Sequence, residues 1–268
     1  MARPSESPAS PPRRLRLSGH TSTGFSHRGH RGRRDFSVSS VSSVANTFGV
    51  ANREFRERLK RRAKAAGIAL DAPLVDGLET YYQLLTKWNA KINLTAFRLT
   101  PAGEDEAVDR LLIEPVVAAR YVPENARTLL DAGSGGGSPA IPLKLARPNL
   151  HVRMVEVKMR KAVFLREAVR TLGIRDAEVE TARFEELLPR AELHEALDLV
   201  SVRAVRIETR TLLTLQAFLR PGGKIFLFRG SGTSTVETEP PPPLAWMASY
   251  PLVDALHSKL VVLSKTRV

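Results

Sequence analysis

A short glycine-rich segment is the part of this sequence best suited to chemistry. Two leucines lead into Asp131, and residues 133–139 then read Gly-Ser-Gly-Gly-Gly-Ser-Pro. An apolar, helix-compatible segment follows, from Ala140 to Ala146. Glycines let a backbone approach a ligand closely, and the start of a helix presents free N–H groups. The order of strand, turn and helix therefore predicts a site for a nucleotide-like ligand.

Three further side chains fall where parallel strands are expected to end, which is the edge at which open α/β sheets bind ligands. Glu156 ends the second predicted strand, and its carboxylate is placed to accept hydrogen bonds from both hydroxyls of a ribose. Phe184 and Glu185 follow the third predicted strand and suit the face and the edge of an adenine. A nicotinamide dinucleotide and S-adenosylmethionine both carry adenosine, so these residues leave the two ligands open.

The glycine turn itself favours one of them. A dinucleotide fingerprint has the spacing G-x-G-x-x-G/A. Gly133 and Gly135 take the first two positions here, but Ser138 stands at the third and Pro139 follows at once. Asp131 would be awkward beside a diphosphate, whereas it suits the amine and sulfonium of S-adenosylmethionine. Residue chemistry thus favours a methyltransferase over a dehydrogenase, and a glycine turn without a ligand is the third possibility.

Alternating strands and helices must position these side chains. Strands are predicted in the central part of the chain at 129–132, 152–156, 177–180, 198–202 and 224–228. Helices are predicted at 140–146, 158–171 and 207–219, and a closing pair of strands at 250–256 and 259–264 after a polar loop at 231–243. This succession predicts a parallel sheet covered by helices.

The preceding residues have helical periodicity. We predict a helix from Phe48 to Ala66, a second that Asp71 caps and that runs to Trp88, and a third from Glu104 to Arg120 that Pro115 bends or divides. The aromatic residues of the second helix recur at three- and four-residue steps, which favours a place in the core over stacking on RNA.

Composition limits the kinds of partner. The chain has 268 residues and a formal net charge of +13, which makes nucleic acid the first candidate partner and an anionic membrane surface the second. The absence of cysteine excludes disulfides and thiolate metal sites, and the six histidines are scattered, so we predict no metal. No apolar run approaches the ~18–20 residues that cross a membrane, so we expect a soluble protein that is not anchored in a membrane.

Residues 1–47 form a basic segment rich in serine, arginine, proline and glycine. Such a segment cannot bury enough apolar surface to offset the entropy of ordering, so we predict disorder. Three interpretations stay open: an arm that contacts RNA, an organelle transit peptide, and an overlong translated start with no role.

Several motifs, taken together, resemble the RsmG (GidB) family over about residues 50–268. The motifs that carry the resemblance are Lys87-Trp88-Asn89 with Asn93-Leu94-Thr95-Ala96, Asp131-Ala132-Gly133-Ser134-Gly135-Gly136-Gly137 with Pro139 and Ile141-Pro142, Val155-Glu156 with Lys161 and Phe164-Leu165-Arg166-Glu167, and Ser201-Val202-Arg203-Ala204-Val205. The glycine segment alone would not identify the family.

The resemblance implies a fold and a domain division. It implies a class I (Rossmann-like) methyltransferase with a mostly parallel seven-stranded α/β sheet, helices on both faces and an N-terminal helical extension. The chain then divides into the disordered basic tail 1–47, the extension 48–124 and the methyltransferase domain 125–268.

The resemblance also implies transfer of a methyl group from S-adenosyl-L-methionine to N7 of a guanine in 16S rRNA, near the decoding site. The partner is then 16S rRNA or the small ribosomal subunit, and the protein is expected to be a cytoplasmic monomer. Two alternatives are a methyltransferase of another substrate, such as a small molecule, and a catalytically silent RNA-binding relative.

Cofactor-binding roles are carried over by matching motif. The predicted set is Asp131, Gly133, Gly135, Ser138, Glu156, Phe184, Glu185 and Arg203. Arg203 would sit beside the cofactor and the incoming base, where it could bind guanine O6 or a phosphate; the alternative is a surface or helix-capping arginine. Guanine N7 carries a free lone pair, so no general base and no catalytic residue is predicted.

This sequence departs from the family pattern at three places. Ser138-Pro139-Ala140 replaces a larger apolar residue, proline and glycine. Arg110-Leu111-Leu112-Ile113-Glu114 replaces a His-Leu-Leu-Asp-Ser element, and Arg229 stands where lysine is usual. The last change keeps the charge but alters the geometry of the donor group.

Overall fold

The structure is a computed structural model that describes residues 39–203, 205, 207–230 and 239–267, with side chains described from residue 49 onward. The chain divides into two units, Met1–Ser40 and Val41–Val268, and the sheet belongs entirely to the second. Most of the segment predicted as disordered, residues 1–38, lies outside the described residues.

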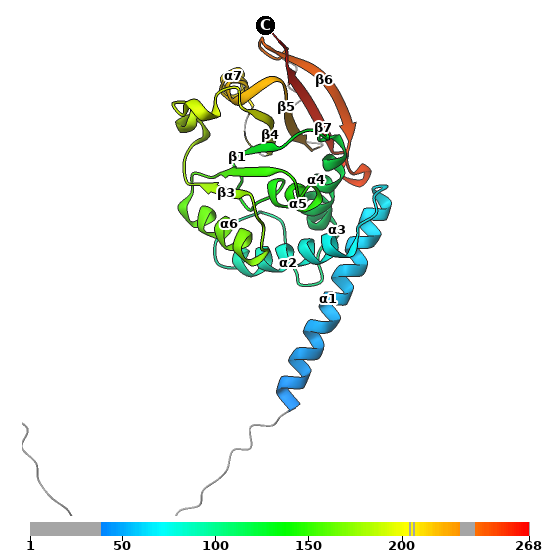
Figure 1. Cartoon of the computed structure of the whole chain (residues 1–268). Coiled ribbons are helices and arrows are strands. Elements are labelled where there is room, and N and C mark those ends of the chain that lie inside the picture. Colours follow the sequence, from blue (N-terminus) through cyan, green and yellow to red (C-terminus); the bar gives the residue numbers. More distant parts are fainter. Residues whose placement is uncertain (1–38, 204, 206, 231–238, 268) are drawn as a thin grey trace, which may run out of the picture. The chain divides into compact units, whose positions relative to one another are not determined.

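A seven-stranded sheet with the order β3-β2-β1-β4-β5-β7-β6 organises the second unit (Figure 1). The strands are β1 Thr128–Ala132, β2 His151–Val155, β3 Ala177–Glu180, β4 Leu197–Arg203, β5 Leu219–Arg229, β6 Leu244–Pro251 and β7 Lys259–Lys265. Strands β1 to β5 are parallel, and β7 runs antiparallel to both β5 and β6. This is the expected class I methyltransferase architecture. The strand order reverses between β1 and β4, so a ligand is expected at the carboxyl ends of these strands.

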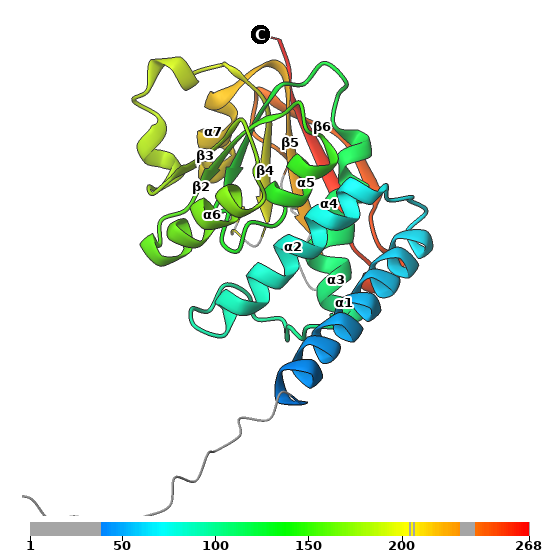
Figure 2. The same ribbon diagram turned by 60° about the horizontal axis from the view of Figure 1, so that its bottom comes forward.

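Helices cover both faces of the sheet, as predicted (Figure 2). The α-helices are α1 Ser39–Ala65, α2 Ala72–Asn89, α3 Asp105–Val108, α4 Glu114–Ala118, α5 Ala140–Ala146, α6 Met159–Thr171 and α7 Thr209–Phe218. Successive strand residues belong to opposite cores: Leu129 packs in the core that α1 to α6 cover, and Leu130 packs in the core that α7 covers.

The first two helices form largely as predicted. Asp71 caps α2, and its carboxylate accepts a hydrogen bond from the Leu74 N–H at 2.8 Å. Tyr81 and Tyr82 on this helix are fully buried, so their core interpretation is confirmed. Helix α1 begins at Ser39 rather than at Phe48, so residues 39–47, predicted as disordered, are helical. A helix that packing has nucleated adds residues at little cost.

The third predicted helix is divided, as Pro115 suggested. It continues from α3 into a π-helical turn, η1 (Asp109–Ile113), then α4, and ends in a 3-10 turn, η2 (Ala119–Tyr121). The Glu114 N–H bonds the Asp109 carbonyl five residues back. Pro115 has no N–H to offer to the carbonyls of the preceding turn, and the side chains of Ser138 and Arg203 reach two of them.

One predicted strand is misplaced. The sequence predicts an extended segment at 250–256, but β6 ends at Pro251 and Asp254–Leu256 form a 3-10 turn, η5. The apolar residues behind that prediction, Leu252 and Val253, are buried in the core outside the sheet. Strand β6 itself lies at the edge of the sheet and exposes Trp246, so its sequence lacks the alternation of a half-buried strand. Within the described ranges, no helix is long and apolar enough to span a membrane.

Candidate functional site

The glycine turn leaves β1 in a backbone conformation that favours glycine. Gly133, Gly135 and Gly137 have φ angles of +77°, +55° and +90°. A Cβ at Gly137 would lie 2.6 Å from Ile141 Cδ1, and one at Gly133 would lie 2.9 Å from Val205 Cγ2. The turn is therefore closely packed at Gly133, Gly136 and Gly137, whereas a Cβ at Gly135 would make only an ordinary contact, 3.8 Å from the Gly133 carbonyl oxygen.

Hydrogen bonds attach this turn to the neighbouring elements. The N–H groups of Gly133 and Ser134 donate to the carbonyl of Val155, at 3.0 and 2.9 Å. The Tyr81 hydroxyl donates to the Gly136 carbonyl at 2.6 Å, and burial raises the pKa of that hydroxyl. Strand β2 and helix α2 thus fix the turn from two sides, which keeps its geometry rigid before any ligand binds.

Glu156 joins the end of β2 to the turn. One carboxylate oxygen accepts from the Gly135 N–H at 2.9 Å, and the other accepts from the Lys158 N–H at 2.7 Å. Each carboxylate oxygen has further acceptor capacity. The side chain is 6% exposed and held in place, so it can still receive the two hydroxyls of a ribose.

A cavity of about 380 Å³ opens at the ends of β1, β2 and β3. Four residues of the predicted set line it: Gly133, Glu156, Phe184 and Glu185. Gly135 adjoins it through its bond to Glu156. The cavity falls in the size range of small-molecule sites, and it combines a carboxylate with an aromatic ring at the expected strand ends. These residues fit an adenosine.

Asp131 lies beneath the turn and does not line this cavity. Its carboxylate is 1% exposed; one oxygen accepts from the Ser201 hydroxyl at 2.5 Å, and the other has no partner in the part of the chain that the structure describes. Burial raises the pKa of Asp131 to about 6, against the opposing effect of the Ser201 hydrogen bond. A buried acceptor without a partner suits a cationic group such as an amine.

Ser138 and Arg203 also do not line the cavity. They meet in a buried polar cluster on the side of α4. The Arg203 guanidinium donates to Ser138 Oγ at 3.2 Å and to Glu114 Oε2 at 2.9 Å, and it also donates to the Arg110 carbonyl. It lies 4.5 Å from the centre of the Phe228 ring. Arg203 is thus neither a surface residue nor free to move, and its cofactor role stays a prediction.

The residue that sequence reasoning missed is Glu114. It is 1% exposed and pairs with two arginines, Arg203 at 2.9 Å and Arg110 at 2.8 Å. Burial raises the pKa of Glu114, and both arginines oppose that shift. Burial likewise lowers the pKa of Arg203. The opposite charges of Arg110 and Glu114, four residues apart in a predicted helix, indicate this ion pair in the sequence.

Two of the three departures from the family pattern, at Ser138 and at Arg110–Glu114, meet in this cluster. Ser138 donates its hydroxyl to the Leu111 carbonyl at 2.7 Å, so Ser138 and Arg203 use two carbonyls of the turn that η1 and Pro115 form. The guanidinium of Arg110 lies 3.0 Å from where a Cβ of Gly230 would stand, next to Arg229 in sequence.

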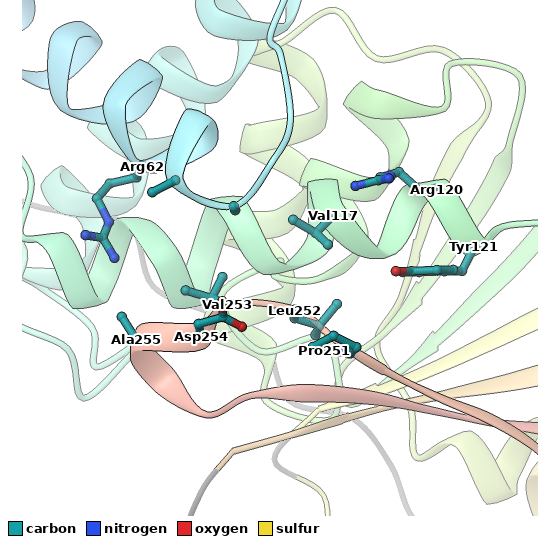
Figure 3. Close-up of a pocket in the computed structure, with 11 residues that line it drawn as sticks. Arg62, Val117, Arg120, Tyr121, Pro251, Leu252, Val253, Asp254 and Ala255 are labelled. Carbon is teal, nitrogen blue, oxygen red and sulfur yellow. The ribbon is translucent and has the colours of Figure 1, made fainter.

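A second cavity, of about 440 Å³, shares no residue with the first (Figure 3). Val117, Arg120 and Tyr121 lie on one side of it and the segment 251–255 on the other. Tyr121 stacks on Tyr250 with ring centres 3.8 Å apart. Residues of the predicted cofactor set do not contribute to this cavity.

Comparisons with known proteins agree with these features. The family model GidB, described as rRNA small subunit methyltransferase G, matches residues 75–239. The chain is similar to the Ribosomal RNA small subunit methyltransferase G of Pelotomaculum thermopropionicum, with 37% identity over 150 residues that make up 56% of this chain and 61% of that protein. The chain thus spans less than two thirds of that relative's length.

Two other similarities concern a second relative and a solved structure. The protein of the same name from Desulfotalea psychrophila is 34% identical over 168 residues, 63% of this chain and 75% of that protein. Among solved structures, the chain is similar to a SAM dependent methyltransferase from Aquifex aeolicus, with 14% sequence identity and a TM-score of 0.47. The match covers 61% of this chain and 94% of that chain.

Proposed function

Because this chain belongs to the GidB family of rRNA small subunit methyltransferase G proteins, we propose that it transfers a methyl group from S-adenosyl-L-methionine to N7 of a guanine in 16S rRNA. The observation that carries the proposal is the cavity in which Gly133, Glu156, Phe184 and Glu185 come together. The substrate is 16S rRNA, free or within the small ribosomal subunit. We further propose that the protein is a monomer, that it acts in the cytoplasm and that it needs no metal.

The residues of the cavity would hold the cofactor by its adenosine. Glu156 accepts the ribose hydroxyls, Phe184 packs against the adenine face, and Glu185 accepts from the adenine edge. Asp131 attracts the amine with its unpartnered oxygen. When bound, the cofactor supplies an electrophilic methyl group on a sulfonium.

The chain's remaining task is alignment rather than proton transfer. Guanine N7 has a free lone pair, so the nucleophile attacks without losing a proton and needs no general base. Holding the base and the methyl group in line can lower the barrier by about 7–11 kcal/mol. Arg203, which ends β4 and pairs with Glu114, would contact guanine O6 or a phosphate and so orient the base, because a cation cannot stabilise the positive charge that moves from the sulfonium to the guanine ring.

The test combines cofactor binding with product analysis. The purified chain should bind S-adenosylmethionine in a calorimetric titration and should transfer a labelled methyl group to 16S rRNA, and nucleoside mass spectrometry should detect one N7-methylguanine. A small-molecule panel and a nicotinamide cofactor serve as comparisons. Methyl transfer to a small molecule but not to rRNA would contradict the substrate.

One observation keeps a silent RNA-binding relative as a second candidate. Glu114, Arg110 and Ser138 already engage the Arg203 guanidinium, which leaves few of its donors for a base. A chain that binds rRNA but shows no heat of cofactor binding would support the silent relative and overturn the enzyme.

A further inference from the structure

The mouth of the adenosine cavity continues into an exposed surface at the start of α6. Val157 lines the cavity and is 53% exposed, while Met159 and Val163 are 62% and 44% exposed. Seven large apolar side chains are exposed in the described part of the chain, and three of them lie here. Exposed apolar groups that gather at the mouth of a cavity indicate a binding surface.

Exposed basic side chains flank these apolar side chains. Lys158, Arg160 and Arg183 are exposed, and none of them forms an ion pair with any residue that the structure describes. Nearby Arg153 and Arg190, in contrast, both pair with Glu180 at 2.7 Å. Arg183 also lines the cavity. We call Val157, Lys158, Met159, Arg160, Val163 and Arg183 the mouth patch.

We propose that the mouth patch binds the unpaired RNA strand that flanks the target guanine, an inference that rests on the proposed function. Lys158, Arg160 and Arg183 contact backbone phosphates, and Val157 and Met159 receive an unstacked base. The basis is charge complementarity, because free cations beside apolar groups match a polyanion whose bases are exposed.

The target chemistry favours a single strand over a duplex. N7 lies in the deep, narrow groove of an A-form helix, which side chains cannot enter. A guanine that reaches the cavity must therefore leave its stack, and its neighbours lose stacking partners as well. The mouth patch gives one of these neighbours an apolar surface next to the point of entry.

The test uses single substitutions with matched controls. Arg160→Ala removes a mouth-patch cation. Arg175→Ala, its control, removes an exposed cation that precedes β3, at the amino ends of the strands and thus opposite the cavity. Met159→Ala removes an exposed apolar side chain, and Met247→Ala removes one of similar exposure, 51%, on the distant strand β6. The probe is a 16S rRNA transcript, and binding is followed by fluorescence anisotropy between about 0.05 and 0.2 M salt, the range over which phosphate contacts change affinity most visibly.

We expect Arg160→Ala to reduce the salt slope of RNA binding by about 0.7, the value for one single-strand phosphate. Both mouth-patch variants should weaken RNA binding by about fivefold, the scale of one exposed contact, and raise the KM for RNA. Both controls should bind RNA like the wild type. Calorimetry with S-adenosylmethionine should give unchanged affinity for all four variants.

The outcomes separate this inference from the proposed function. Wild-type protein that methylates rRNA, with mouth-patch variants that bind RNA as tightly as the controls, overturns the mouth patch alone. Wild-type protein that does not methylate rRNA overturns the proposed function. If Met159→Ala and Arg160→Ala instead lose binding to phosphatidylglycerol vesicles and keep RNA binding, the surface serves a membrane and the RNA assignment is wrong.

Discussion

Asp131 is 1% exposed, and one of its carboxylate oxygens has no partner among the residues that the structure describes. Ionised, it has to bear the cost of leaving water, which the Ser201 hydrogen bond and the smaller effects of Ser134 and Arg203 offset only in part. Its pKa rises to about 6 from the ordinary 3.8 for this reason. Ionised Asp131 therefore lowers the stability of the ligand-free protein, and a cationic group of a ligand would offset this loss by pairing with the carboxylate.

This shift predicts a change of stability with pH. Below about pH 4 Asp131 is protonated in both the folded and the unfolded chain; between pH 4 and pH 6 only the folded chain keeps the proton. The free energy of unfolding therefore falls as pH rises through this window, by on the order of 3 kcal/mol. Asp131→Asn should remove that fall, which urea unfolding at a series of pH values can measure. Parallel profiles for variant and wild type would contradict the assignment.

The glycine turn offers a matched pair of substitutions. Gly137→Ala forces a Cβ to 2.6 Å from Ile141 and to 3.1 Å from Leu165 at a φ of +90°, and should cost about 1–3 kcal/mol from strain together with cofactor affinity. Gly135→Ala places a Cβ at an ordinary contact distance, 3.8 Å from the Gly133 carbonyl oxygen, at a φ of +55°, close to the left-handed region that other residues tolerate. Thermal unfolding should rank Gly137→Ala as the less stable variant, and the reverse order would count against the packed turn.

At the scale of the element, the break in the third helix places a carboxylate between two arginines. Glu114→Gln removes the only buried anion that pairs with Arg203 among the described residues. Breaking a buried pair from one side costs about 3–5 kcal/mol because the other charge loses its partner. Glu167→Gln breaks an exposed pair with Arg170 on α6 and should stay near wild type. Chemical denaturation of both variants tests the contrast, and equal midpoints would contradict it.

Local signals predict elements well where neighbours in sequence determine them. Helix α5 occupies the predicted residues 140–146, and Asp71 caps α2 with its own side chain. The sequence does not reveal the π-helical turn at 109–113, because its partners, Ser138 and Arg203, lie far away along the chain. The predicted position of strand β6 is wrong for a similar reason, since an edge strand with exposed side chains shows little alternation of apolar and polar residues.

The candidate site follows the same division. Glu156, Phe184 and Glu185 are predictable because the ends of parallel strands meet at one edge of the sheet. The cofactor roles of Ser138 and Arg203 rest on family resemblance, and the structure separates both residues from the cavity. Glu114 escapes prediction because its role depends on two arginines from different elements.

For the whole molecule, the net charge of +13 predicts how RNA binding responds to salt. Each phosphate that a cation neutralises contributes about −0.7 to −0.9 to the slope of log K against log salt concentration. We expect affinity for a 16S rRNA transcript to fall steadily between about 0.05 and 0.2 M salt in an anisotropy titration. Cofactor binding in the same salt series is the control. A flat response for RNA would count against an RNA substrate.

The π-helical turn has a consequence for sequence variation. The acceptors that hold Ser138 and Arg203 are backbone carbonyls, of Leu111 and Arg110, so they persist whatever side chains occupy those positions. Related chains can therefore exchange residues 110 and 111 while keeping the anchorage of the buried arginine, provided that the turn survives. The side chains themselves limit tolerance at these positions, because Arg110 pairs with the buried Glu114 and Leu111 packs in the core. Tolerance should also be low at Pro115, where a residue with an N–H would compete for the same carbonyls.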